Sequence, residues 1–176
     1  GMSMSHSSWT DADVALLQEV YDLLCKSRMN AIYYEQRLNR LQAHSFWMEV
    51  VTAATASGSG LAALTLFQTE PGRWIWQSLA LVAAVVAVIR PIYAPGKRIE
   101  AFTRQQQGYH ANFFALTKLA FVIRQGGIIT DDHRRRYDTS FDRYVQLSTE
   151  DESAPNLKCL EEAQRRAQEE LPPNRF

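Results

Sequence analysis

Two apolar runs without a single charged residue dominate the hydrophobic pattern of this chain. They are Val50–Phe67, with 18 residues, and Trp74–Ile89, with 16, and a short turn containing Pro71 and Gly72 joins them. Charged residues make up 22% of the whole chain. At that frequency, about seven would be expected in runs of this combined length. The pattern predicts a hairpin of two helices from which charge is excluded.

Both arms approach the length of a transmembrane helix, which needs roughly 17–25 mainly apolar residues. With their flanks they would span about 46–67 and 73–93. The flanks supply aromatic and arginine side chains suited to the membrane interface, namely Trp47, Arg73, Trp74, Trp76 and Arg90. A soluble hairpin would normally keep a polar face on at least one helix. The sequence therefore favours two transmembrane helices over a hairpin buried in a soluble bundle.

The two arms differ in composition. The second is rich in Val, Leu and Ile and is expected to face lipid, whereas Gly, Ser and Thr dilute the first. Small or hydroxylated residues of the first arm lie at spacings that share a helix face or permit close helix packing: Thr52, Thr55, Gly58, Ser59, Gly60 and Ala63. These residues are candidates for lining a pore, and packing within the hairpin is an equally good interpretation.

A single long helix is predicted before the hairpin. Thr10 is a favourable N-cap, with Asp11 and Asp13 in the first turn, where the helix dipole favours acids. No Pro or Gly interrupts the chain from Val14 to Ser57, so the helix is expected to continue into the first arm. Its apolar stripe is expected to begin with Val14, Leu17, Tyr21 and Leu24.

Three further helices are predicted after Pro91, Pro95 and Gly96 end the second arm. One covers about Arg98 to Gln125 and ends at Gly126-Gly127, the next is capped by Thr130, and the last opens at Pro155 and stops at Pro172-Pro173. Their expected buried faces are Ile99, Phe102, Tyr109, Phe113, Leu116, Ala120 and Ile123; Tyr137, Phe141 and Tyr144; and Leu157, Leu160, Ala163, Ala167 and Leu171.

The predicted fold is therefore all-α, with a two-transmembrane hairpin and long cytoplasmic helices before and after it. Residues 1–9 are expected to be disordered, residues 10–171 to form one domain, and residues 172–176 to form a tail. Basic residues flank the outer ends of both arms, whereas the turn carries only Arg73, so both termini are predicted to be cytoplasmic. The 19 basic and 19 acidic residues cancel, which gives no indication of nucleic-acid binding.

No motif for catalysis, metal binding or cofactor binding is found. Gly58-Ser59-Gly60 lacks the strand and the Lys-Ser/Thr pair of a phosphate loop. Asp131-Asp132-His133 is better explained as a helix start than as a metal site. Cys25 and Cys159 suggest neither zinc binding nor a disulfide framework. The protein is not expected to be an enzyme.

Four segments carry a resemblance to a known family. They are Tyr33-Tyr34-Glu35-Gln36-Arg37, Pro91–Arg98, Phe141-Asp142-Arg143-Tyr144 and Cys159–Arg166. Over about residues 10–171 the chain resembles the SLATT domains, two-transmembrane modules associated with SMODS nucleotidyltransferases and SLOG sensors in bacterial conflict systems. The resemblance implies an effector that oligomerises and forms a pore in, or perturbs, the bacterial inner membrane during antiphage defence. It also implies a nucleotide-signalling or sensor protein as partner.

Two alternatives stay open. In one, the hairpin only anchors the protein, and the aromatic-striped helices form a docking platform for a partner. In the other, the protein is a soluble helical oligomer and the hairpin is buried at its centre. Association with carbonate-washed membranes separates the second alternative from the membrane hypotheses.

Overall fold

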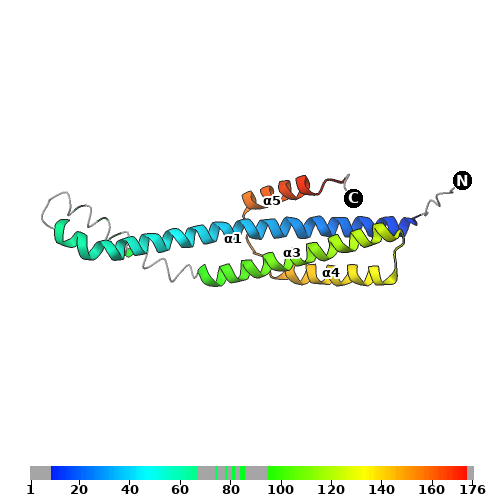
Figure 1. Cartoon of the computed structure of the whole chain (residues 1–176), viewed down its shortest axis with the longest axis horizontal. Coiled ribbons are helices and arrows are strands. Elements are labelled where there is room, and N and C mark those ends of the chain that lie inside the picture. Colours follow the sequence, from blue (N-terminus) through cyan, green and yellow to red (C-terminus); the bar gives the residue numbers. More distant parts are fainter. Residues whose placement is uncertain are drawn as a thin grey trace. The chain divides into compact units, whose positions relative to one another are not determined.

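The computed structural model describes residues 9–66, 74, 78, 81, 84–85 and 95–173, with residues 54–66 described by their backbone alone. Over these residues it contains helices α1 (Asp11–Leu66), α3 (Pro95–Gly126), α4 (Asp131–Thr149) and α5 (Leu157–Glu170) and no strand, which confirms the all-α class (Figure 1). The predicted turn at 68–73, most of the second arm and residues 1–8 and 174–176 lie outside this description. Within the part that is described, no helix combines the length and the apolar composition that crossing a membrane requires.

The first helix is continuous, as predicted. α1 contains 56 residues and passes through Gly58, Ser59 and Gly60 without a break. At its start the Thr10 hydroxyl accepts a hydrogen bond from the Asp13 amide (3.3 Å), and the Asp13 carboxylate accepts one from the Thr10 amide (3.2 Å). This reciprocal pair satisfies two amides that the first turn of a helix leaves without partners.

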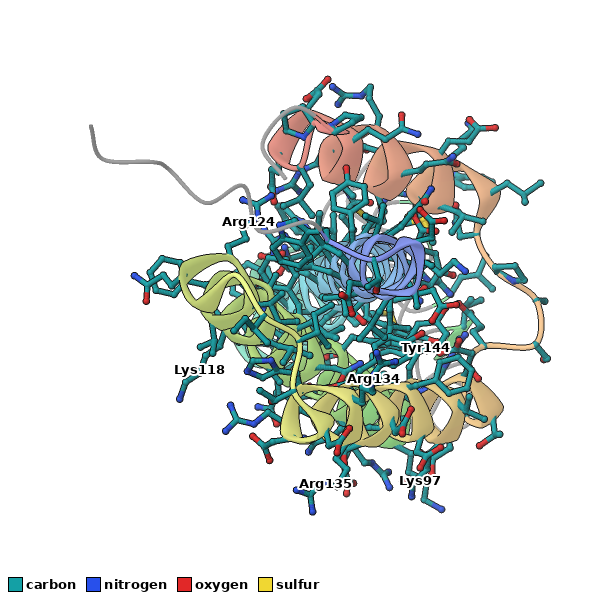
Figure 2. The ribbon with its side chains drawn as sticks, turned by 90° about the vertical axis from the view of Figure 1, so that its right-hand side faces the viewer. Lys97, Lys118, Arg124, Arg134, Arg135 and Tyr144 are labelled. Carbon is teal, nitrogen blue, oxygen red and sulfur yellow. The ribbon has the colours of Figure 1, made fainter. Side chains whose placement is uncertain are left out.

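The chain divides into two compact units. Unit 1 comprises residues 1–37 and 102–176, and unit 2 comprises Leu38–Ala101. Within unit 1, the amino-terminal part of α1 lies between α5 on one side and α3 and α4 on the other (Figure 2). This central position explains why residues on more than one face of α1 are buried, including Leu24, Ile32 and Tyr34.

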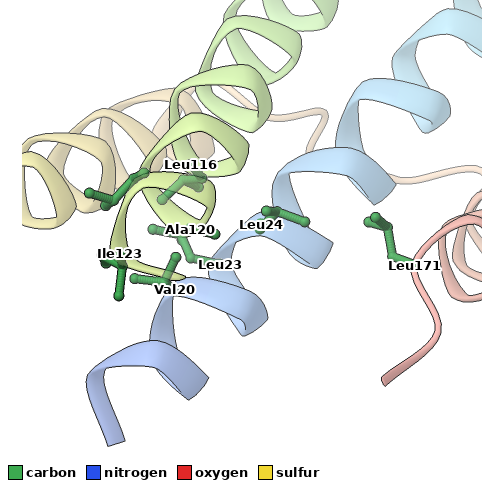
Figure 3. Packing of buried hydrophobic residues seen from close by; sticks show 8 residues of the cluster. Val20, Leu23, Leu24, Leu116, Ala120, Ile123 and Leu171 are labelled. Carbon is green, nitrogen blue, oxygen red and sulfur yellow. The ribbon is translucent and has the colours of Figure 1, made fainter. Parts of the chain in front are cut away.

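A regular stripe on α3 builds the core of unit 1. Its buried residues are separated alternately by three and four positions: Phe102, Gln105, Tyr109, Asn112, Leu116, Leu119 and Ile123. This is the repeat that packs knobs into holes in helical bundles. The carboxy-terminal part of this stripe packs against α1 and against Leu171 at the end of α5. Together they form one apolar cluster, made of Val20, Leu23, Leu24, Leu116, Leu119, Ala120, Ile123 and Leu171 (Figure 3).

Single residues of three predicted buried faces were wrong, while the rest of each face is buried or half-buried. On α4 the side chains of His133 and Ser140 are buried and those of Tyr137 and Tyr144 are half-buried, but Phe141 is exposed. One residue turns a helix by about 100°, so the stripe that contains Tyr137, Ser140 and Tyr144 leaves Phe141 outside.

On α5 and α1 the first residue of the predicted face was wrong, whereas Ala163, Ala167 and Leu24 are buried as predicted. On α5 the small residues Cys159, Ala163 and Ala167 face inward, while Leu157 is 68% exposed. On α1 Val14 is exposed, and Leu16 and Val20 are buried in its place.

The helix ends follow local signals closely. Gly127 has a φ of 62° and its amide donates to the Ile123 carbonyl (3.0 Å), which closes α3 where the glycine pair predicts. Thr130 and His133 form a reciprocal cap at the start of α4. The cap of α5 is Asn156 rather than Pro155, and Pro95 begins α3 three positions before the expected start.

Candidate functional site

Large apolar side chains of unit 2 are exposed near both predicted arms. Trp47 and Trp74, two of the predicted interface anchors, are 64% and 75% exposed, and Phe46, Leu81 and Val85 are exposed as well. Trp74, Ser78, Leu81, Ala84 and Val85 all have helical backbone, and the Ser78 hydroxyl donates to the Trp74 carbonyl one turn back (2.9 Å). Exposed clusters of large apolar residues are typical of surfaces that meet lipid or a protein partner.

The structure describes the side chain of only one of the predicted pore-lining residues, Thr52. Thr52 is half-buried, and its hydroxyl donates to the Met48 carbonyl of the same helix (2.7 Å), so the polar group is satisfied within α1. Five further candidates lie on the α1 backbone without described side chains: Thr55, Gly58, Ser59, Gly60 and Ala63. Three anchors lie outside the described residues, namely Arg73, Trp76 and Arg90.

A second site lies in unit 1, where the loop between α4 and α5 meets α1 and α3. We call it the tyrosine–acid cluster, and it consists of Tyr33, Tyr34, Arg37, Gln105, Tyr109, Asp151 and Glu152. The Asp151 carboxylate accepts hydrogen bonds from the Tyr34 hydroxyl (2.8 Å) and the Tyr109 hydroxyl (2.8 and 2.9 Å). The Gln105 amide donates to the same carboxylate (3.2 Å) and to the Leu147 carbonyl (2.9 Å). Asp151 therefore links α1 to α3.

Glu152 makes the other half of the cluster. Its carboxylate accepts a hydrogen bond from the Tyr33 hydroxyl (2.7 Å) and pairs with both the Nε and Nη2 atoms of Arg37. Such two-point pairing fixes a guanidinium against a carboxylate more firmly than a single contact does. The two tyrosine hydroxyls also accept from loop amides, Tyr34 from Glu152 and Tyr33 from Asn156, both at 3.0 Å. Tyr33, Tyr34 and Arg37 therefore hold both the side chains and the backbone of this loop.

Burial controls the protonation of the cluster. Burial raises the pKa of Tyr33 to about 12, with a smaller contribution from the hydrogen bond to Glu152. Burial also raises the pKa of Tyr34 and Tyr109, so all three hydroxyls remain protonated donors at physiological pH. The pKa of Asp151 is raised by burial and held back by the hydrogen bonds from Tyr34 and Tyr109. With its acidic groups committed to tyrosine and arginine donors, the cluster is arranged to hold the loop in place.

Sequence analysis singled out some residues of this site but did not predict that they form a cluster. Tyr33, Tyr34 and Arg37 belong to the segment that carries the SLATT resemblance, and Asp151 and Glu152 lie in what the sequence shows only as a polar loop. Tyr34 and Asp151 are 117 positions apart, so no local pattern pairs them. The only available signal was two adjacent tyrosines on a helix with an arginine one turn later.

Unit 1 also contains a cleft of about 310 Å³ at the start of α1 and the end of α3. Its lining is Val14, Leu17, Gln18, Tyr21, Asp22, Ala120, Arg124 and Pro173. The walls are mainly apolar, and the Tyr21 hydroxyl donates to the Leu171 carbonyl (2.6 Å).

Across residues 9–66 and 95–173 and the few described positions between, no three His, Cys, Asp or Glu side chains are grouped to hold a metal ion. His133, which stands next to Asp131 and Asp132 in the sequence, accepts a hydrogen bond from the Thr130 amide through Nδ1. It acts as a helix cap.

Comparison with known proteins gives no further assignment. No protein-family model, no curated protein and no solved structure matches this sequence. The resemblance to SLATT domains therefore stays a prediction made from the sequence.

Proposed function

We propose that this protein acts at a lipid bilayer, where several copies assemble and form a pore or otherwise perturb the membrane. The observation that carries the proposal is the charge-free composition of Val50–Phe67 and Trp74–Ile89, together with the exposed Trp47, Trp74 and Leu81 beside and within these runs. Water is a poor solvent for such a surface, and a bilayer with its aromatic interface accommodates it well.

The pore form of the proposal requires self-assembly, since one hairpin cannot enclose a channel. The Thr52, Thr55 and Ser59 face of the first arm is proposed to line the path or to pack between copies. A bacterial antiphage role and activation by a nucleotide-signalling or sensor protein extend the proposal and rest on the resemblance to SLATT domains alone.

Membrane association is tested by carbonate extraction of cells expressing the full chain. We expect the protein in the washed membrane pellet. Leu81→Lys places a charge in the second arm, which costs about 2.5–3.5 kcal/mol near the centre of a membrane helix, so we expect more protein in the supernatant. Phe114→Lys is the matched control, because Phe114 is similarly exposed (57% against 67% for Leu81) but lies on α3 in unit 1. Release of the unaltered protein by carbonate would refute membrane integration and favour the soluble oligomer.

Pore formation is tested by dye and ion release from liposomes. Ser59→Leu should abolish release while leaving insertion unchanged, because it replaces a small hydroxylated side chain on the proposed lining face. Ser78→Leu, on the second arm, is the control and should leave release intact. Equal release from the Ser59→Leu variant and the unaltered protein would remove this face from the proposal.

A membrane-anchored docking module is the second candidate function. Phe114 and Phe121 on α3 of unit 1 are 57% and 58% exposed and lie seven positions apart, on one side of the helix. Phe121→Lys should abolish the binding of a protein partner at this surface and leave dye and ion release from liposomes unchanged. The two candidate functions are thereby separated.

A further inference from the structure

The tyrosine–acid cluster lies close, along the chain, to the two positions where unit 1 ends and resumes. Two helices, α1 and α3, contribute residues to both units. In α1 the cluster supplies Tyr33, Tyr34 and Arg37, and Arg37 is the last residue of unit 1 before unit 2 begins at Leu38. In α3 it supplies Gln105 and Tyr109, shortly after unit 1 resumes at Phe102. The loop between α4 and α5 therefore binds both helices within about two turns of the point where each passes into unit 2.

This loop is held by polar contacts. Asp151 and Glu152 carry the bonds to Tyr33, Tyr34, Arg37 and Tyr109, whereas residues 153–155 are exposed. The other end of unit 1 is different, because its cluster of aliphatic side chains includes Val20, Leu119 and Leu171. A hydrogen bond to a charged group contributes about 1.5–3 kcal/mol net. A loop that is held by such bonds and has few buried apolar contacts opens locally more readily than an apolar core.

We propose that the loop between α4 and α5 is a latch that fastens α1 to α3 at the end of unit 1 from which both helices continue into unit 2. When the latch is closed, Asp151 and Glu152 hold the two helices at a fixed spacing. When it opens, the ends of both helices are released while the apolar cluster keeps the rest of unit 1 folded. The latch is formed by residues of unit 1 and does not depend on the proposed membrane activity.

The Tyr34→Phe/Tyr109→Phe double variant tests the latch, because it removes both hydroxyl donors to Asp151 and the acceptor for the Glu152 amide. Hydrogen–deuterium exchange of the full chain is measured by mass spectrometry. We expect exchange at 150–156 to rise by about tenfold or more, together with a clear rise at 32–45 and 98–109. Peptides at 16–27 and 113–123 should keep the exchange rates of the unaltered protein.

Tyr21→Phe is the matched control, since it removes another tyrosine hydroxyl bond, to the Leu171 carbonyl, far from the loop in unit 1. It should leave exchange at 32–45 and 98–109 unchanged. If the double variant does not fold, Arg37→Gln takes its place. It breaks the pair with Glu152 and the contact of the guanidinium with the Phe102 ring, and a rise of about threefold at the same peptides is expected.

Two results would overturn the latch. Faster exchange confined to 150–156, with α1 and α3 unchanged, would show that the loop does not restrain the helices. An equal rise in every peptide of unit 1 would show that the cluster supports the whole fold rather than one end of it.

Discussion

At the scale of single residues, Asp151 shows how burial and hydrogen bonding oppose each other. Burial disfavours its charged form, and the two tyrosine hydroxyls favour that form, yet the pKa remains raised above 3.8. The groups that interact with it are Tyr34 from α1, Gln105 and Tyr109 from α3, and Tyr144 from α4. Ionised Asp151 is therefore a cost to the folded state, offset only in part by its donors.

The raised pKa of Asp151 has a definite consequence for stability. The folded state binds this proton more tightly than the unfolded chain does, so the contribution of Asp151 to the free energy of unfolding falls as pH rises from about 4 through the folded pKa. Asp151→Asn removes this titration. Urea unfolding of both proteins from pH 4 to pH 7 should show the balance moving steadily in favour of the variant as pH rises. A constant difference, or one that moves toward the unaltered protein, would contradict this expectation.

Residue-scale signals that act within one or two turns could be predicted from the sequence. Thr10, Thr130 and the Gly126-Gly127 pair end or begin helices where expected, because capping depends on neighbours three or four positions away. Asp151 could not be recognised in the same way. Its partners lie 42 and 117 positions away, and only the folded bundle brings them together.

At the scale of secondary-structure elements, α3 combines apolar and polar residues in one buried stripe. Hydrophobic periodicity found Phe102, Tyr109, Leu116 and Ile123, but it passed over Gln105 and Asn112, because polar residues are normally assigned to the solvent face. Both are buried because the bundle gives them partners. The Asn112 amide donates to Ser27 on α1 (3.2 Å) and to the Ser140 carbonyl on α4 (3.1 Å), so one side chain joins three helices.

Replacing Asn112 should therefore weaken the contact between α1, α3 and α4. Asn112→Ala leaves the Ser140 carbonyl and the Ser27 hydroxyl without this donor and is expected to lower the free energy of unfolding by about 1–3 kcal/mol. Thr117→Ala on the same helix is the control, because the Thr117 hydroxyl donates only to the Phe113 carbonyl one turn back. Urea unfolding followed by circular dichroism should place the control within about 0.5 kcal/mol of the unaltered protein. An equal loss in both variants would contradict the bridging role.

At the scale of the whole molecule, unit 1 is assembled from two parts of the chain that unit 2 separates. Leu171 shows the consequence most directly, because it packs in the cluster with Val20, Leu23 and Leu24, and its carbonyl accepts from Tyr21, 150 positions earlier. Sequence periodicity predicted the helices themselves. It did not predict which helix would be central, because α1 and α5 are far apart in the sequence and come into contact only in the folded protein.

The closure of unit 1 can be tested at Leu171. Leu171→Ala removes most of a buried side chain and should lower the free energy of unfolding by about 2–4 kcal/mol. Leu157→Ala is the matched control at the start of α5, because Leu157 is 68% exposed and should change stability little. The measurement is thermal or urea unfolding of the full chain. Similar losses for both leucines would mean that α5 is not anchored by its last turn.

The discontinuity of unit 1 also sets an order of events during synthesis. A ribosome completes the whole of unit 2 before it makes any of the α3, α4 or α5 residues that α1 needs as neighbours. At ~5–20 residues per second, the first half of α1 waits several seconds for its partners. Both uncharged runs are synthesised within that interval. In nascent chains, unit 2 should therefore meet its surroundings before unit 1 can fold. The tyrosine–acid cluster can form only afterwards, once Asp151 and Glu152 have been made.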